Sequence, residues 1–254
     1  MMILLVIALA PFQILGLLLE RIGRPWLVGV IPLAFHRILL KIWNVRLTLQ
    51  GQLSSERPLL LVSNHVSWLD IVVLGAVAPV CFVAKSEIRN WPVFGTLAKL
   101  QRTVFVSRSN RRESGEQVSD IAKRMASRSV IVLFPEGTTT DGNQLAPFKT
   151  TLFEAAKIAL TNASVETAIV QPAAINYTHF HGLPFGRADR IHIAWPGELG
   201  LAESFIPIIK HGALDVTFHL GAPIKLDRTS NRKVVANDAA EEIRRILDSS
   251  RYDS

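Results

Sequence analysis

Residues 59–78 read LLLVSNHVSWLDIVVLGAVA, a stretch in which an apolar run changes into a helical pattern. The apolar run covers Leu59 to Ser63, and the helical pattern covers Ser67 to Ala78, with a polar turn between them. Short, continuous apolar runs that alternate with helices are typical of strands in a sheet covered on both faces. This stretch therefore predicts a strand, a turn and a helix as one unit of an α/β fold.

The same alternation continues along the chain after about Thr48. Further strands are predicted at six places: Val80–Ala84, Thr103–Ser107, Ser129–Phe134, Ala168–Ile175, Arg190–Trp195 and Leu214–His219. Further helices are predicted at four places: Pro92–Leu100, Glu113–Ala126, Phe148–Leu160 and Asp238–Leu247. The predicted fold class is therefore α/β, with a mostly parallel central sheet flanked by helices.

An uncharged apolar segment precedes this region. Met2–Leu19 reads MILLVIALAPFQILGLLL, and a membrane-spanning helix needs about 20 apolar residues. No basic residue precedes the segment, as one would in a secretory signal, and Arg21 and Arg24 follow it. Basic residues on this flank favour a cytoplasmic location for the rest of the chain. We therefore predict an N-terminal helical anchor in a cell membrane, the inner membrane if the source is a bacterium.

A second apolar segment, Trp26 to Trp43, is interrupted by Pro32 and carries His36, Arg37 and Lys41. These residues favour a helix that lies in the headgroup layer over one that spans the membrane. With the first segment it could form a hairpin within one leaflet, and the sequence leaves a hairpin and a single spanning helix both open. We predict an anchor over residues 1–47 and a second domain over residues 48–254.

The composition favours a membrane partner over nucleic acid. Of 254 residues, 49% are hydrophobic and 19% are charged, and the net charge of +7 attracts anionic partners. Nucleic-acid-binding surfaces combine basic residues with exposed aromatic ones, but the aromatic share is 7% with two Tyr. We therefore expect the basic residues to face anionic lipid, and we expect no nucleic acid. The single cysteine, Cys81, rules out a disulfide within the chain.

A histidine and an aspartate follow the first strand. In an open α/β sheet, ligands bind at the carboxyl ends of strands, and His65 lies at such an end. Asp70 lies in the first helical turn, where its carboxylate can fold back toward the imidazole and leave the other ring nitrogen as a base for a substrate hydroxyl. Ser67 and Asp70 also match a capping box, which would explain both residues without a catalytic role. The capping box does not explain His65.

A second strand end carries an acidic residue and a glycine. The buried run Val130–Phe134 continues into Pro135, Glu136, Gly137 and Thr138. A glycine here lets a substrate approach the backbone closely, beside a carboxylate. An ordinary turn is the alternative interpretation.

Together these motifs resemble those of the glycerolipid acyltransferase family, which includes the 1-acylglycerol-3-phosphate acyltransferases. The Asn-His-x-Ser-x-x-Asp segment at 64–70 resembles the first family motif, and Phe-Pro-Glu-Gly-Thr at 134–138 resembles the third. Lys-Ser-Glu at 85–87 and the segment that ends at Arg108 are similar to the second motif. Val-Gln-Pro-Ala at 170–173 is similar to the fourth. The resemblance covers about residues 63 to 175.

The resemblance implies an O-acyltransferase that esterifies the sn-2 hydroxyl of lysophosphatidic acid to give phosphatidic acid. His65 would be the general base and Asp70 would orient it. Arg108 would bind the acceptor phosphate, and Glu136 and Gly137 would position the glycerol part. The other substrate-binding positions that it implies are Asn64, Ser67, Lys85, Thr138 and Pro172. Acyl-CoA or acyl carrier protein would supply the acyl group, with no metal, no cofactor and no covalent acyl-enzyme.

Two departures from the family pattern widen the choice of acceptor. Many members have Ile-Asp-Arg where this chain has Val106–Arg108, and many have Arg where it has Thr139. One usual phosphate contact is therefore missing, although Lys149 or the pair Arg111 and Arg112 could replace it. The acceptor is either lysophosphatidic acid or another lysolipid, such as the zwitterionic lyso-ornithine lipid.

Other classes of function have less support. A catalytically silent membrane scaffold need not keep His65, Asp70 and Glu136 together, and this chain has all three. A nucleic-acid-binding protein rests on net charge alone. The sequence has no Gly-x-Ser-x-Gly elbow, Walker loop, His-Glu-x-x-His or Gly-x-Gly-x-x-Gly, which removes the main support for hydrolases, zinc proteases and dinucleotide enzymes.

Overall fold

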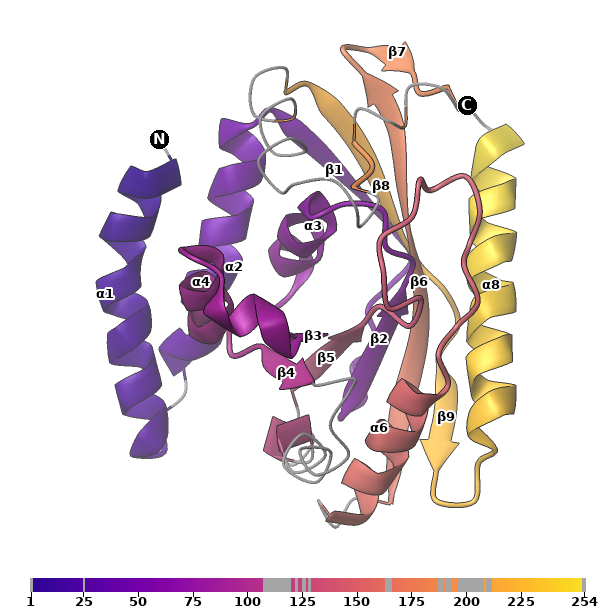
Figure 1. The fold of residues 1–254 in the computed structure, drawn as a ribbon, viewed down its shortest axis with the longest axis horizontal. Helices are drawn as coiled ribbons and strands as arrows, with labels where there is room; N and C mark the ends of the chain where they lie inside the picture. The colour runs from indigo at the N-terminus through magenta and orange to yellow at the C-terminus, as the bar shows by residue number, and fades with distance from the viewer. Residues whose placement is uncertain are drawn as a thin grey trace.

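The computed structural model describes residues 2–24, 26–106, 120–121, 123–124, 127, 129–162, 166–186, 190, 193–195, 208 and 212–252. Within them a sheet runs through the molecule, with helices on both of its faces (Figure 1). Its strands lie side by side in the order β1 (Val45–Gln50), β8 (Leu214–Leu220), β6 (Thr167–Phe180), β2 (Leu59–Ser63), β5 (Val130–Leu133), β3 (Val80–Lys85) and β4 (Val104–Val106). The short strands β7 (Leu183–Pro184) and β9 (Ile224–Asp227) pair with β6.

Parallel pairing dominates the part of the sheet that carries the site. β2 is parallel to both β5 and β6, and β3 is parallel to both β5 and β4. β1 is parallel to β8, while β6 pairs antiparallel with β7, β8 and β9. The predicted α/β class with a mostly parallel sheet is confirmed.

β2 is central because its sequence is apolar on both faces. Successive side chains of a strand point to opposite faces. Leu59 and Leu61 therefore join one hydrophobic cluster, while Leu60 and Val62 join another on the opposite face. Each of these leucines is at most 1% exposed, and burying one contributes roughly 1.5–3 kcal/mol. A strand with this pattern is stable only between two layers of helices.

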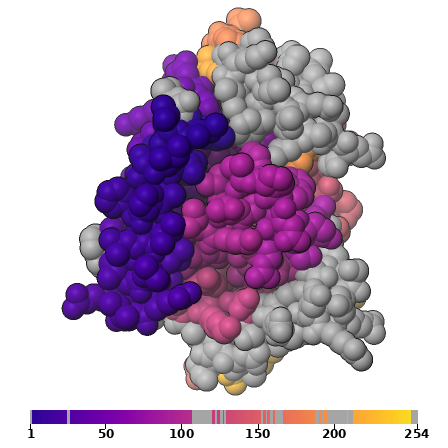
Figure 2. Space-filling model, turned by 60° about the vertical axis from the view of Figure 1, so that its left-hand side comes forward, coloured from indigo at the N-terminus to yellow at the C-terminus, as the bar shows by residue number. Residues whose placement is uncertain are grey.

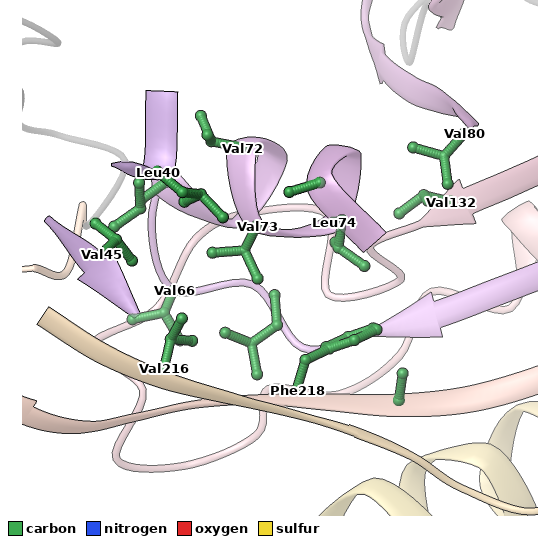
Figure 3. Packing of buried hydrophobic residues seen from close by; sticks show 14 of the residues in the cluster. Leu40, Val45, Val66, Val72, Val73, Leu74, Val80, Val132, Val216 and Phe218 are labelled. Carbon is green, nitrogen blue, oxygen red and sulfur yellow. The ribbon is translucent and has the colours of Figure 1, made fainter. Parts of the chain in front are cut away.

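The helices that form those layers lie on either side of the sheet (Figure 1). α2 (Trp26–Ile42) and α3 (Leu69–Val77) contribute to the first cluster, and Figure 3 shows Leu40, Val73 and Phe218 gathered in it. α6 (Thr151–Asn162) and α8 (Arg232–Tyr252) contribute to the second. The buried residues of α8 recur at helical spacing: Val235, Ala236, Ala239, Ala240, Ile243, Ile246 and Leu247. The 3₁₀ helix η1 (Ser86–Asn90) and α4 (Phe94–Leu100) follow β3.

The N-terminal helix α1 (Met2–Arg21) packs against α2 and leaves an apolar face uncovered. The two helices approach closely at Gly16, where an added Cβ would lie 3.1 Å from the Cβ of Leu27. Large apolar side chains of α1 are exposed: Ile3, Leu4, Ile7, Phe12, Ile14, Leu15 and Leu18. By length and composition α1 is able to cross a membrane, with a mean hydropathy of 2.6.

Some predicted elements differ from the structure. The strand predicted at Arg190–Trp195 is wrong for the residues that are described there: the N–H groups of Ile193 and Ala194 donate to the carbonyl of Arg190, which forms a turn in place of a strand pairing. β1 was not predicted, and it lies across the proposed boundary at residue 47, so that division stays a prediction. The helix predicted at 113–126 lies mostly outside the described residues.

Candidate active site

His65 and Asp70 meet in the turn between β2 and α3. The turn places His65 Nδ1 2.8 Å from Asp70 Oδ2, and the Asp70 side chain is fully buried. The same oxygen accepts the backbone N–H groups of Val66, at 2.7 Å, and Ser67, at 2.9 Å. The carboxylate therefore binds the turn that leads into α3 and also holds the imidazole. Half of the predicted capping box is present: the Ser67 N–H donates to the Asp70 carboxylate, but the Asp70 N–H donates to the Ser67 carbonyl and not to its hydroxyl. The N-cap residue of α3 is Trp68, which makes no side-chain capping hydrogen bond.

This geometry defines which nitrogen of His65 can act as a base. A carboxylate only accepts hydrogen bonds, so Nδ1 carries the proton that it donates to Asp70. The lone pair of the neutral ring is then on Nε2. The ring stacks on Phe134, with centroids 4.0 Å apart and planes 15° apart, and its side chain is 16% exposed. His65 is thus fixed in tautomer and orientation while still open to a substrate.

The backbone of His65 is held by the Pro-Glu-Gly-Thr loop. Its N–H donates to Glu136 Oε1 at 2.7 Å, and its carbonyl accepts the N–H of Thr140 at 2.9 Å. Glu136 Oε2 accepts the N–H of Ala146 at 2.8 Å. Both oxygens of Glu136 therefore bind backbone donors, one from each of two loops. The two sequence motifs are in contact through this carboxylate.

Burial is the main influence on Glu136. Glu136 is only 2% exposed, and the loss of hydration on burial raises the pKa of its carboxyl group from 4.5 to about 7. The N–H groups of Ala146 and His65 oppose the rise in pKa, and the negative charge of Asp70 adds to it. The Glu136 carboxyl group therefore accepts its two backbone hydrogen bonds at a high cost in desolvation. The contact between Glu136 and the lipid substrate, which the family resemblance implies, stays a prediction.

A cavity of about 980 Å³ opens beside His65. Its wall is mostly apolar and includes Met2, Val6 and Leu9 of α1, Phe35 and Leu39 of α2, Leu97 of α4, and Phe134. Figure 2 shows α1, in indigo, beside the magenta surface that η1 and α4 contribute. Among the described residues of the lining, the charged side chains other than histidine are Lys85, Glu87 and Lys149. The cavity suits a lipid chain with a charged head.

Three of the predicted substrate-binding residues line this cavity: Lys85, Gly137 and Thr138. Gly137 adopts a φ of 70°, a conformation that favours glycine. Thr139, the position of one departure from the family pattern, also lines it and donates its hydroxyl to the carbonyl of Trp195.

Three others, Asn64, Ser67 and Pro172, are not among the residues that line the cavity. Asn64 is buried and exchanges two hydrogen bonds with the backbone of Ile175, which ties the turn to β6. Ser67 is fully buried, and its hydroxyl accepts the N–H of Leu69. Pro172 lies in β6, paired with Val62, between the residues that pair with β9 and those that pair with β8. A direct role for these three in binding stays a prediction, and Arg108 lies outside the described residues.

Sequence reasoning missed one residue of the site, Tyr177. Its hydroxyl donates to Asp70 Oδ1 at 2.7 Å, and the side chain is buried at the end of β6. No local pattern marks it, because its partner is 107 positions away. Burial and the negative charge of Asp70 raise the pKa of Tyr177 well above 10, so its phenol stays a donor.

The described residues contain no group of three or more His, Cys, Asp or Glu that could hold a metal ion. An imidazole that is held by a buried carboxylate at the wall of an apolar cavity is able to deprotonate a hydroxyl group of a lipid. The fold and the site are those expected of an α/β enzyme that acts on a lipid.

Comparison with known proteins gives the family. Residues 44–176 match the family model described as "Acyltransferase". The chain is 44% identical to the lyso-ornithine lipid O-acyltransferase of Rhizobium meliloti (strain 1021), over 97% of this chain and 83% of that protein. It is 45% identical to the protein of the same name from Brucella abortus (strain 2308), over 98% and 92%. The 1-acyl-sn-glycerol-3-phosphate acyltransferase of Neisseria gonorrhoeae is 39% identical over 42% of each chain.

A solved structure has the same fold. The 1-acyl-sn-glycerophosphate acyltransferase of Thermotoga maritima matches with a TM-score of 0.61 and 17% identity, over 99% of this chain and 98% of that one. The protein belongs to the glycerolipid acyltransferase family and is a lysolipid acyltransferase.

Proposed function

We propose that the acceptor of this acyltransferase is lyso-ornithine lipid. The observation that carries the proposal is the similarity to two lyso-ornithine lipid O-acyltransferases over at least 97% of the chain. The 39% identity to the 1-acyl-sn-glycerol-3-phosphate acyltransferase of Neisseria gonorrhoeae covers 42% of the chain, and the 1-acyl-sn-glycerophosphate acyltransferase structure that matches 99% of the chain is 17% identical. The motifs alone favoured lysophosphatidic acid as the acceptor and lyso-ornithine lipid as the alternative. The relatives reverse this order, so lysophosphatidic acid is now the second candidate.

The charges at the cavity agree with a zwitterionic head group. Ornithine with an acylated α-amino group keeps one carboxylate and one ammonium group. Lys85 and Glu87, which both line the cavity, offer one charge of each sign. Thr139 occupies the position where many relatives carry the arginine expected to contact a phosphate. We propose that Lys85 faces the carboxylate and Glu87 faces the ammonium group.

The proposed reaction uses His65 as a base and then as an acid. Nε2 takes the proton of the acceptor hydroxyl as its oxygen attacks the carbonyl carbon of an acyl thioester. The tetrahedral intermediate collapses, the C–S bond breaks, and the thiolate takes the proton from the imidazolium. Asp70 stabilises the imidazolium through Nδ1–H. The thioester is that of acyl-CoA or acyl carrier protein, and the scheme needs no metal or other cofactor.

We further propose that α1 lies in the cytoplasmic leaflet of the cell membrane as one arm of a hairpin with α2. Met2, Val6 and Leu9 face the cavity, while Ile3, Leu4 and Ile7 are exposed. A helix that left the body of the protein to span the bilayer would lose the first set of contacts. An interfacial position keeps them and immerses the exposed side chains in lipid.

The test is release of free thiol from oleoyl-CoA and from oleoyl-carrier protein by purified membranes. Lyso-ornithine lipid and lysophosphatidic acid are compared at equal mole fraction, and membranes with the His65→Ala variant are the blank. Turnover of lyso-ornithine lipid at least tenfold above lysophosphatidic acid supports the proposal. The reverse preference overturns the acceptor assignment and keeps the reaction class.

A further inference from the structure

Tyr177 reaches the catalytic pair from β6, within the hydrophobic cluster that also includes the buried residues of α3. It lies in β6 opposite Val216 of β8, and the register of these strands shifts directly after it, between Tyr177 and His179. Its hydroxyl donates to Asp70 Oδ1 at 2.7 Å. The residue is 5% exposed and is not among the residues that line the cavity. Tyr177 therefore contacts the carboxylate from outside the cavity lining.

The two oxygens of Asp70 have different partners. Oδ2 accepts three donors: His65 Nδ1, the N–H of Val66 and the N–H of Ser67. Within the described part of the chain, Oδ1 accepts one donor, the hydroxyl of Tyr177. Three of these four donors come from the turn that Asp70 itself closes. Tyr177 is the one contributed by a distant strand, and it fixes the rotation of the carboxylate about its terminal bond.

We propose that Tyr177 is a positioning residue that tunes the basicity of His65 through Asp70, an inference that rests on the proposed acyl transfer. A hydrogen bond to Oδ1 draws negative charge away from Oδ2. Oδ2 then attracts the Nδ1 proton less strongly and stabilises the imidazolium less. Without the Tyr177 hydroxyl, Oδ2 attracts the Nδ1 proton more strongly, and we expect the acid limb of the rate profile to move toward alkaline pH.

Other charged groups surround the pair and set the background for this effect. Glu136 binds the His65 N–H, while Lys85, Glu87 and Lys149 share the cavity with the ring. His36, which also lines the cavity, packs on Gly75 of α3, and Arg37 donates to the carbonyl of Ala76. The hydroxyl of Tyr177 donates to Asp70 and not to any of these groups, so a shift in the profile reports on a change transmitted through Asp70.

The first variant is Tyr177→Phe, which removes one hydroxyl and keeps the ring. The expected result is that the acid limb of kcat/KM for lyso-ornithine lipid moves upward by about half a unit to one unit, a three- to tenfold loss on that limb. KM stays within twofold of the wild type, because Tyr177 does not line the cavity. Val216→Ala is the matched control, since it perturbs the facing strand and keeps the hydroxyl. The Val216→Ala variant should have a lower melting temperature, and the acid limb of its kcat/KM profile should stay at the pH of the wild type.

The second measurement strengthens the hydrogen bond from Tyr177 to Asp70 instead of removing it, so the acid limb should shift in the opposite direction. The chain has two tyrosines, Tyr177 and Tyr252, so growth on 3-fluorotyrosine modifies few positions. A fluorinated phenol is a stronger hydrogen-bond donor, and the acid limb should move toward lower pH. The same labelling of a Tyr252→Phe protein should give the same shift.

Opposite shifts from the two substitutions support the proposal. An unchanged acid limb in both, or shifts of the same sign, overturns it. Wild-type membranes that acylate neither lyso-ornithine lipid nor lysophosphatidic acid contradict the proposed function instead, so the two failures are distinguishable.

Discussion

Glu136 connects the two loops of the site, and replacing it with glutamine separates a supporting role from a binding role. In the wild type, Oε1 accepts the N–H of His65 and Oε2 accepts that of Ala146. An amide has one acceptor oxygen and one donor NH₂ group, so Glu136→Gln keeps one of these hydrogen bonds and sets a donor against the other. One buried backbone N–H is left without an acceptor, which costs about 1–3 kcal/mol.

The pH dependence of this loss follows from the raised pKa of Glu136. The group ionises near pH 4.5 in the unfolded chain and near pH 7 in the folded one, so the folded state binds the extra proton between these values. Stability from this group is complete below pH 4.5 and falls as pH rises through 7, by about 3 kcal/mol in total. The glutamine variant has no such loss. It should be less stable than wild type at pH 5, and the difference should narrow or reverse by pH 8.

The assay is denaturant unfolding in detergent at pH 5, 6, 7 and 8, followed by thiol release at each pH where the protein is folded. We expect kcat to fall by about 10- to 100-fold, because displacement of the His65 backbone misplaces the base, while KM changes little. If KM rises while kcat and stability stay unchanged, Glu136 contacts the acceptor, and the supporting role is refuted. A pH-independent stability difference would refute the raised pKa.

The remaining predictions concern the base, the membrane face and the head group. His65→Ala should lower kcat by about 10²–10⁴-fold without changing the melting temperature or the fraction bound to vesicles; activity near wild type would remove His65 as the base. Replacing both Ile7 and Leu18, exposed on α1, with Gln should reduce flotation with anionic vesicles, whereas Leu183→Gln, at an exposed residue of β7, should not. Equal flotation of the wild type, the double variant and the Leu183 variant would contradict the membrane face. Glu87→Gln should raise KM for lyso-ornithine lipid about two- to fivefold, as expected for an exposed ion pair, and leave KM for lysophosphatidic acid unchanged; equal effects on both lipids would exclude Glu87 as the ammonium contact.

Local sequence predicted the parts of the fold that are determined locally. β2 and β5 are continuous apolar runs buried on both faces, so their type and position followed from composition. β1 was missed because its sequence, VRLTLQ, is mostly exposed and its pairing partner β8 lies about 170 residues further on. β6 continues past its predicted end at Ile175 because β8 pairs with it as far as Phe180. In this extension Tyr177, Thr178 and Phe180 favour a strand, but Asn176 and His179 interrupt the apolar run on which the prediction was based.

The site divides in the same way. The contact between His65 and Asp70 depends on five residues of turn, and it was predictable from their spacing. The position of Glu136 beside His65 depends on β2 and β5 being neighbours, which a single strand pattern does not specify. Tyr177 and the apolar wall from α1 depend on packing between distant segments, and no local pattern identifies them.

That wall has a kinetic consequence. Met2, Val6 and Leu9 belong both to the cavity beside His65 and to a helix with an uncovered apolar face. With α1 in the membrane leaflet as we propose, a lipid would enter the cavity by lateral diffusion without passing through water. The relevant concentration of acceptor is then its mole fraction in the surface, and bulk molarity has no direct effect on the rate. Adding inert phospholipid at constant total acceptor should slow the enzyme by surface dilution, while adding buffer to the same vesicles should not.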